Sequence, residues 1–257
     1  MYLRNGIGMK ERRIKILDYV TSKEKIKVAE LAKLMNVSEV TIRTDLQALE
    51  DKGLLTRIHG GAISKLGDNV SNRLKYNYQI KKSIAAKAAE MVSEGETVMI
   101  ESGSTNAILA QMLAETRRIS IITNSFFIAD FINGMPNAHL LLLGGDFQNE
   151  PQVCYGPLTI QAMQNFFVDK VFIGTDGVSD EGFTNVDIRR AQVVSEMAKR
   201  ANNVVVITDS SKFYKRGVAK ELSFDDITHV ITDAGIPDDS AQLLKTHNIK
   251  LITVPQK

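Results

Sequence analysis

Small polar residues follow five apolar runs in the second half of the chain, at the positions where the strands of a sheet would end. One example is the turn in ESGSTNAILAQML, which comes directly after the apolar run TVMI. Backbone amides at the start of a helix bind anions, hydroxyls and amides suit a polyol, and a lysine adds a cation for a phosphate. The sequence therefore predicts a phosphorylated sugar as the ligand. The candidate binding residues are Ser102, Gly103, Ser104, Thr105, Thr123, Asn124, Ser125, Gly144, Gly145, Asp176, Gly177 and Lys212.

Ordinary turn chemistry is one alternative for these residues, because plain strand-to-helix turns also favour Gly, Ser and Thr. Catalysis is a second alternative, in which a carboxylate would remove a carbon-bound proton from a sugar phosphate. Glu101, Asp176 and Asp209 stand at strand ends where such a base could lie, but no feature of the sequence pairs any of them with an acid. We therefore assign no catalytic residue.

Short apolar runs alternate with helical patterns from residue 76 to residue 257. Runs such as KVFIGTDG, NVVVITDSS and HVITDAG alternate with patterns such as RRAQVVSEMAKRA and DDSAQLLKTHN. This alternation is typical of a parallel sheet with helices on both faces. We expect residues 76–257 to form one α/β domain, in which the carboxyl ends of the strands make the ligand crevice.

Three helical patterns and a glycine turn occupy the first sixty or so residues. KVAELAKLMNV and SEVTIRTDLQALEDKGLL are separated by a short break, and Ser38 is a suitable N-cap for the second of them. Together they predict a helix-turn-helix at about residues 27–46. The following LLTRIHGGAI predicts the hairpin wing of a winged helix. Residues 1–62 would then form a DNA-binding domain.

The second helix of this pair has the residue types that a DNA major groove accepts, because short polar and basic side chains fit there. Val40, Ile42, Leu46 and Leu49 are expected to form its buried side, and Asp45 is expected to pair with a neighbouring basic residue. The alternative is a small helical bundle that binds another protein. The candidate DNA-binding residues are Ser38, Thr41, Arg43, Thr44 and Gln47 on the helix and Arg57 and His59 on the wing.

Charge and composition support two domains with different partners. Residues 1–62 carry 12 Lys and Arg against 8 Asp and Glu, a balance of +4, and the remainder carries 20 against 22, a balance of −2. The basic part fits a polyanion partner, and the polar residues 63–75 are a candidate linker. The apolar runs are too short to span a bilayer, so we expect no membrane partner and a cytoplasmic location. A single cysteine, Cys154, excludes an internal disulfide, and four histidines without ligand spacing predict neither a metal nor a cofactor.

The N-terminal motif resembles the DNA-binding signature of the DeoR/GlpR family of bacterial sugar-catabolism regulators. VAELAKLMNVSEVTIRTDLQALEDKGLLTRIHGGA matches the family pattern in its Leu-Ala, Val-Ser, Thr-Ile-Arg, Asp-Leu, Leu-Glu and His-Gly-Gly-Ala steps. Thr44 replaces the second arginine of the family's Arg-Arg pair. The resemblance continues through DSSKF at residues 209–213. Glu101 stands where the family more often has Asp, and Arg190 precedes Ala191 where the family commonly has an acidic residue.

The resemblance implies a winged helix-turn-helix followed by a parallel-sheet α/β effector domain similar to sugar-phosphate isomerases. It implies a sequence-specific DNA-binding transcriptional regulator, a repressor of a carbohydrate-utilisation operon, rather than an enzyme. The expected partners are double-stranded operator DNA, a phosphorylated sugar effector and further copies of the chain in a homodimer or homotetramer, because paired half-sites add specificity. Two alternatives stay open: an isomerase-like enzyme with a basic N-terminal module, and a DNA-binding protein whose second domain only oligomerises.

Overall fold

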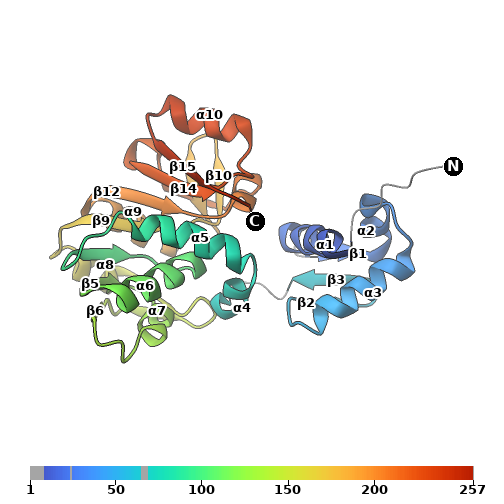
Figure 1. Ribbon diagram of the computed structural model, residues 1–257, viewed down its shortest axis with the longest axis horizontal. Coiled ribbons are helices and arrows are strands. Elements are labelled where there is room, and N and C mark those ends of the chain that lie inside the picture. The colour runs from blue at the N-terminus through green and yellow to red at the C-terminus, as the bar shows by residue number, and fades with distance from the viewer. Residues whose placement is uncertain (1–8, 24, 65–68, 257) are drawn as a thin grey trace. The chain divides into compact units, whose positions relative to one another are not determined.

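The computed structural model describes residues 9–23, 25–64 and 69–256, and the chain divides into two compact units (Figure 1). The first unit ends at Tyr76 and the second begins at Asn77. Much of the predicted linker, residues 63–75, belongs to the first unit, because Ser64 ends a strand and Val70–Lys75 form helix α4. Asn69 caps α4, and Val70 is buried. Residues 1–8 of the predicted DNA-binding domain and 65–68 of the predicted linker lie outside the described residues.

The first unit is a winged helix-turn-helix, as the sequence predicts. Its helices are α1 (Met9–Lys23), α2 (Val28–Met35) and α3 (Glu39–Glu50). Strands β1 (Lys25–Lys27), β2 (Leu55–Ile58) and β3 (Gly61–Ser64) form an antiparallel sheet in the order β1-β3-β2. The sequence did not predict β1. It pairs with β3 where a Cβ on Gly61 would come within 2.4 Å of the Ile26 carbonyl oxygen, so this contact requires glycine.

Helix α3 begins with the predicted cap, since the Ser38 hydroxyl accepts a hydrogen bond from the Thr41 amide at 3.2 Å. Ile42, Leu46 and Leu49 are buried, as predicted. The prediction for Val40 is wrong, because its side chain is 69% exposed. Val40 precedes Ile42 by two residues, which places it about 200° away around the helix and therefore outside the buried face.

Asp45 joins α3 to α1 through two arginines. Its carboxylate is buried, with Oδ2 at 2.6 Å from Nε of Arg12 and Oδ1 at 2.7 Å from Nε of Arg13. A buried carboxylate is tolerated only when it has such partners. The predicted pairing of Asp45 with basic residues is confirmed, so this side chain supports the fold of the unit.

Seven parallel strands form the main sheet of the second unit, in the order β15-β14-β12-β9-β4-β5-β6. Residues such as Val98, Val171 and Val205 in the central strands are fully buried, because helices cover both faces of the sheet. The strands are β4 (Thr97–Ile100), β5 (Ile119–Thr123), β6 (Ala138–Leu142), β9 (Val168–Ile173), β12 (Ala201–Ile207), β14 (His229–Asp233) and β15 (Lys250–Val254).

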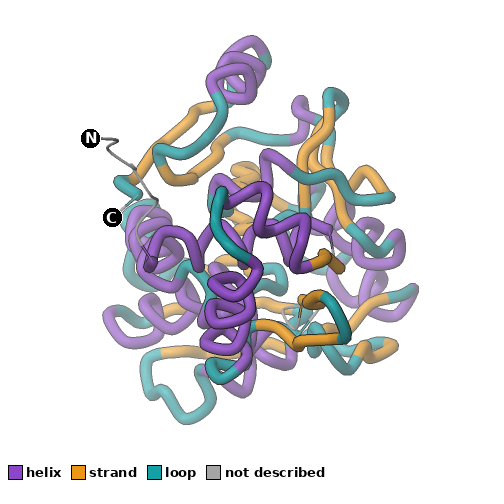
Figure 2. Tube along the Cα trace, turned by 90° about the vertical axis from the view of Figure 1, so that its right-hand side faces the viewer, coloured by secondary structure: helices purple, strands orange, loops and turns teal. Residues whose placement is uncertain are grey.

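The helices of this unit form two groups; Figure 2 colours all helices of the chain purple and all strands orange. Helices α5 (Tyr78–Ala89), α6 (Ser104–Thr116) and α7 (Phe126–Phe131) pack side by side, whereas α8 (Pro157–Met163) packs with α9 (Ile188–Ala198). Helix α10 (Asp238–Thr246) packs against β15. From β4 the following strands are added toward one edge of the sheet, and from β9 they are added toward the other edge. Because the crossovers are right-handed, α6 and α9 lie on opposite faces of the sheet.

The strand order reverses between β4 and β9. In open α/β sheets, ligands bind outside the carboxyl ends of the strands at this reversal. The turn that follows β4 contains residues 101–103, and the turn that follows β9 contains residues 174–176. Two of the five predicted strand ends therefore meet at the place where the fold favours a ligand.

Several short elements were not predicted. A second antiparallel sheet has the order β10-β11-β13 and consists of Gly177–Ser179, Gly182–Asn185 and Ala219–Leu222. A hairpin joins β7 (Asp146–Gln148) to β8 (Val153–Tyr155), and two 3₁₀ turns, η1 (Ser210–Tyr214) and η2 (Phe224–Asp226), follow β12 and β13. Strands of three or four residues are too short to show an apolar period in the sequence.

Candidate functional site

Glu101 connects the two turns at the strand reversal. Its backbone amide donates to the Phe172 carbonyl at 2.9 Å, and its carboxylate accepts from the Gly174 amide at 3.1 Å and from the Ser102 hydroxyl at 2.5 Å. Asn106 from α6 donates to the Glu101 carbonyl at 2.8 Å. The β4 and β9 turns are thus held together by one buried side chain that the sequence alone left without a role.

The N-terminus of α6 lies at this junction. Its N-cap is Gly103, at φ 141°, which has no side chain to accept hydrogen bonds from the amides of the first turn. Ser104, Thr105 and Asn106 of that turn are buried. Uncapped first-turn amides carry the positive end of the helix dipole and suit an anion.

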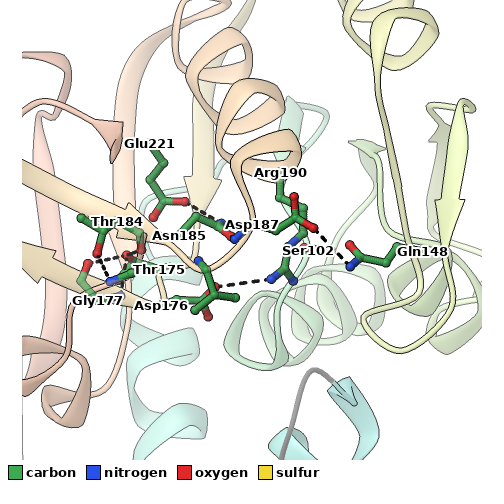
Figure 3. A network of polar contacts seen from close by, with 12 residues as sticks. Ser102, Gln148, Thr175, Asp176, Gly177, Thr184, Asn185, Asp187, Arg190 and Glu221 are labelled. Carbon is green, nitrogen blue, oxygen red and sulfur yellow. Dashed lines mark hydrogen bonds and ion pairs between the residues drawn. The ribbon is translucent and has the colours of Figure 1, made fainter. Parts of the chain in front are cut away.

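Asp176 follows β9 and pairs with two cationic side chains, of which Figure 3 shows Arg190. Its Oδ2 is 3.7 Å from Nη2 of Arg190, and its Oδ1 is 3.7 Å from Nζ of Lys212. Arg190 is buried although it is an arginine, and Figure 3 shows it extending from α9 toward Asp176, with Ser102 beside it. The site therefore brings cations from α9 and η1 to the turns after β4 and β9.

Two further charged residues belong to the same region. Asp209, which follows β12, and Lys81, from α5, are both buried. Burial alone would raise the pKa of Asp209, but the charges of Lys81 and Lys212 and hydrogen bonds from Ser211 hold that pKa below its usual value. The Asp209 side chain also caps η1 by accepting from the Ser211 amide at 3.2 Å. Asp209 therefore has a structural role as the N-cap of η1.

Two carboxyl groups of the site have raised pKa values. Burial raises the pKa of Glu101 to about 7, against the opposing effects of the Ser102 and Gly174 hydrogen bonds and of Arg190. Burial likewise raises the pKa of Glu221, from β13, to about 8, although Asn185 donates to it at 2.8 Å. Asp176 raises both values further through its charge. Carboxyl groups with perturbed pKa values are typical of functional sites.

The β7–β8 hairpin also reaches this region. Gln148 donates to Asp187, the N-cap of α9, at 3.3 Å (Figure 3). Arg189 pairs with the same carboxylate, and this holds the pKa of Asp187 down at about 2. The Gln148 Oε1 atom is buried without a hydrogen-bond partner in the structure. A polar ligand at the end of α9 could satisfy it.

Thr123, Asn124 and Ser125, predicted as ligand residues after β5, are buried and make hydrogen bonds within the protein. The Asn124 side chain donates to the Cys154 carbonyl at 2.9 Å. The Thr123 hydroxyl accepts from the Ser125 amide at 3.1 Å, and the Ser125 hydroxyl caps α7. These bonds give each of the three side chains a structural role at the β5–α7 turn, and ligand contact by them stays a prediction.

Gly144 and Gly145, which follow β6, pack against α8, the helix that follows β8. Thr159 of α8 donates to the Gly144 carbonyl at 2.8 Å. A Cβ on Gly145, where φ is 152°, would lie 2.0 Å from the Thr159 hydroxyl, so close packing already requires glycine there. Gly177 is similar, because its Cβ would lie 2.5 Å from the Lys215 carbonyl oxygen. For these three glycines too, ligand contact stays a prediction.

In the first unit, three of the five predicted DNA-binding residues of the helix, Arg43, Thr44 and Gln47, line one exposed groove, whereas Ser38 and the half-buried Thr41 do not. Arg13, Val40, Arg43, Thr44, Gln47, Ala48, Asp51 and Arg57 line it. Arg43 pairs with Glu39 at 2.6 Å, and Gln47 donates to Asp51 at 2.8 Å while its Oε1 accepts from Arg57 of the wing. His59 is exposed in the β2–β3 turn, and Ser38 is exposed at the start of α3.

Metal and membrane features are not found in the described part of the chain. No group of three or more His, Cys, Asp or Glu residues there could hold a metal ion. No helix among the described residues combines the length and the apolarity needed to cross a bilayer.

Comparison with known proteins assigns the chain to a family. The DeoR-like helix-turn-helix domain matches residues 12–66, and the DeoR C-terminal sensor domain matches residues 76–234. The chain belongs to the DeoR family of transcriptional regulators. This confirms the predicted family, the winged helix with an α/β domain, and the predicted function as a DNA-binding regulator.

Relatives of this DeoR-family chain match over nearly its whole length. It is 30% identical to the putative aga operon transcriptional repressor of Escherichia coli O157:H7, over 96% of this chain and 94% of that protein. It is 29% identical to the HTH-type transcriptional repressor GlcR of Bacillus subtilis (strain 168), over 96% of each chain. Among solved structures, ribose 5-phosphate isomerase A from Methanocaldococcus jannaschii is 21% identical over 53% of this chain and 55% of that one, with a TM-score of 0.39.

Lys81, Asn185 and Glu221 are site residues that the sequence reading missed. Lys81 lies in the helical pattern QIKKSIAAKAAE beside a second lysine, Lys82, where a buried lysine looks like an exposed one. Asn185 and Glu221 come from strands of four residues. One sequence signal did point to this region: Arg190 departs from the family pattern, and in the structure it pairs with Asp176.

Proposed function

We propose that this DeoR-family chain represses a carbohydrate-utilisation operon and that a phosphorylated sugar, bound in the second unit, controls its affinity for operator DNA. The observation that carries the proposal is the meeting of the uncapped α6 N-terminus with Arg190 and Lys212 at the strand reversal. Amides and cations would hold the phosphate, and Glu101 and Asp176 would accept hydrogen bonds from sugar hydroxyls.

Two further observations support the proposal. Two relatives that each match 96% of the chain are named as repressors, one of them of the aga operon. Asp176 is flanked by two cations, and Glu101 accepts hydrogen bonds from Ser102 and Gly174. Both carboxylates are therefore held in place by neighbouring groups of the protein. The family consists of regulators, which disfavours the isomerase alternative.

A panel of sugar phosphates tests the effector proposal. We expect calorimetry to show binding of at least one pentose or hexose phosphate, and weaker binding of the same sugar without its phosphate. The same ligand should change operator affinity, because control requires different ligand affinities in two states of the protein. Binding of operator DNA with no response to any member of the panel would favour a purely oligomerising second unit. Turnover of a bound sugar phosphate would revive the enzyme alternative.

We infer that α3 enters the major groove and that a second copy of the chain supplies the second half-site. Arg43 would then donate hydrogen bonds to a guanine or a phosphate, after its ion pair with Glu39 breaks. Ser38, Thr41, Thr44 and Gln47 would flank it, and Arg57 and His59 of the wing would reach the backbone phosphates.

The Arg43→Ala variant should bind operator DNA more weakly, by roughly 10- to 100-fold, as expected for losing one arginine contact. Sugar-phosphate binding should be unchanged. Arg118→Ala, which removes an exposed arginine paired with Glu94 in the second unit, is the matched control and should bind DNA like the wild type. Gel-shift titrations at fixed salt measure both. Wild-type operator affinity in Arg43→Ala would refute the assignment of α3 as the recognition helix.

A further inference from the structure

Val40 is an exposed apolar side chain in the first turn of α3. It is 69% exposed, whereas Ile42, Leu46 and Leu49 of the same helix are buried. A valine at this position adds nothing to the core, and it is a poorer helix former than alanine. Its presence in the first turn of the recognition helix therefore calls for a role outside the fold of the unit.

The position of Val40 on the helix gives it DNA-binding neighbours. Arg43, Thr44 and Gln47 follow it by three, four and seven residues, so the four side chains share one face of α3. All four line the groove described above. The N-terminal residues of a recognition helix are those that approach base edges.

The polar side chains around Val40 are engaged with one another. Thr44 donates its hydroxyl hydrogen to the Val40 carbonyl at 3.1 Å, and Arg43 pairs with Glu39. Gln47 is bonded at both ends, to Asp51 and to Arg57. The N-terminal end of this face therefore offers the methyl groups of Val40 to a partner, and the hydrogen-bonding groups of Arg43, Thr44 and Gln47 follow along the same face.

The charge around the groove favours nucleic acid over an apolar protein surface as the occupant. Arg13, Arg43 and Arg57 line it, against one acidic residue, Asp51. Within the major groove, thymine is the base that presents a methyl group, on C5. An apolar side chain in a groove that three arginines line matches a thymine methyl group set among phosphates.

We propose that Val40 contacts the C5-methyl group of a thymine in each operator half-site and so helps to select the DNA sequence. This rests on the proposed binding of α3 in the major groove. It adds an apolar contact to a base, which the predicted set of polar and basic residues lacks. Because the contact is apolar, it contributes by removing methyl surface from water, about fourfold in affinity for each buried methyl group.

The test combines variants of the full-length protein with operator duplexes in which uracil replaces thymine at one symmetric pair of positions at a time. Uracil lacks only the C5-methyl group. An operator is first selected from random duplexes with the wild type. The wild type should lose several-fold in affinity at one pair of positions, and Val40→Ala should lose a similar amount on unmodified DNA and be insensitive to uracil at that pair.

Leu34→Ala is the matched control, because Leu34 is an apolar side chain of α2 that is 44% exposed and lies outside the groove. It should keep the uracil profile of the wild type. The proposal is overturned if Val40→Ala binds like the wild type, or if it stays sensitive to uracil at every position where the wild type is sensitive. Selection of no specific operator by the wild type would contradict sequence-specific DNA binding itself, which is a separate result.

Discussion

Replacing Arg190 by alanine is expected to weaken sugar-phosphate binding at least about 100-fold. Arg190 is buried, and its guanidinium lies 3.7 Å from the Asp176 carboxylate and close enough to Glu101 to lower the pKa of that group. Truncating one partner of a buried charge pair at a binding interface typically costs about 2–5 kcal/mol of binding free energy, because the other charge is left buried and uncompensated. In the proposed site, the ligand phosphate would also lose its cation from α9. Isothermal titration calorimetry with the best sugar phosphate of the panel measures the change.

Two further variants separate binding from folding. Arg200→Ala removes the same charge just beyond the other end of α9, where Arg200 pairs with Glu196, and it should bind the ligand like the wild type. Arg190→Lys keeps the charge but not the planar fork of donors, so it should bind with intermediate affinity. Operator binding without ligand should persist in all three variants. A folded Arg190→Ala protein with wild-type ligand affinity would remove Arg190 from the proposed site.

The same arginine bears on the choice between sensor and enzyme. The family pattern that the chain resembles commonly has an acidic residue at this position, and here Arg190 pairs with Asp176 instead. A carboxylate base must reach a carbon-bound proton of the substrate, whereas the two oxygens of Asp176 are paired with Arg190 and Lys212. This arrangement suits the holding of a ligand better than the abstraction of its proton.

Much of this fold could be predicted because its elements are long enough to show a period. The helices around Ile42 and Leu46 have the 3.6-residue pattern, and the parallel strands are continuous apolar runs bounded by glycines and hydroxyls. The wrong prediction for Val40 came from counting apolar residues without applying that period. Ile42, Leu46 and Leu49 form one stripe at helical spacing, and Val40 lies about 200° around the helix from Ile42, outside that stripe.

The part of the site that comes from short strands could not be predicted. Glu221 lies in AKEL, where a charged residue suggests a surface position, yet the strand is covered and the side chain is buried. Its environment depends on Asn185 and on the pairing of β11 with β13, which are distant in sequence. Local patterns give no information on such a contact.

The buried carboxyl group of Glu221 is expected to make the stability of the second unit depend strongly on pH. Burial raises the pKa of its carboxyl group from 4.5 to about 8 in the folded protein. Between those values the folded state holds a proton that the unfolded state releases, so stability falls as pH rises from about 4.5 to about 8. Glu101, whose pKa is raised from 4.5 to about 7, adds a second decline in stability, which ends near pH 7.

Glu221→Gln should remove the larger part of this decline, because the amide keeps the hydrogen bond with Asn185 and cannot ionise. At pH 8 the second unit of the variant should melt roughly 5–10 °C above that of the wild type, and near pH 5 the two should melt together, since a few kcal/mol corresponds to such a shift. Differential scanning calorimetry from pH 5 to pH 8.5 measures both. Glu181→Gln, at an exposed carboxylate paired with Lys220, should follow the wild type throughout. If the Glu221→Gln and wild-type curves stay parallel over this range, Glu221 is already ionised in the folded protein, and its charge must be balanced by groups other than Asn185.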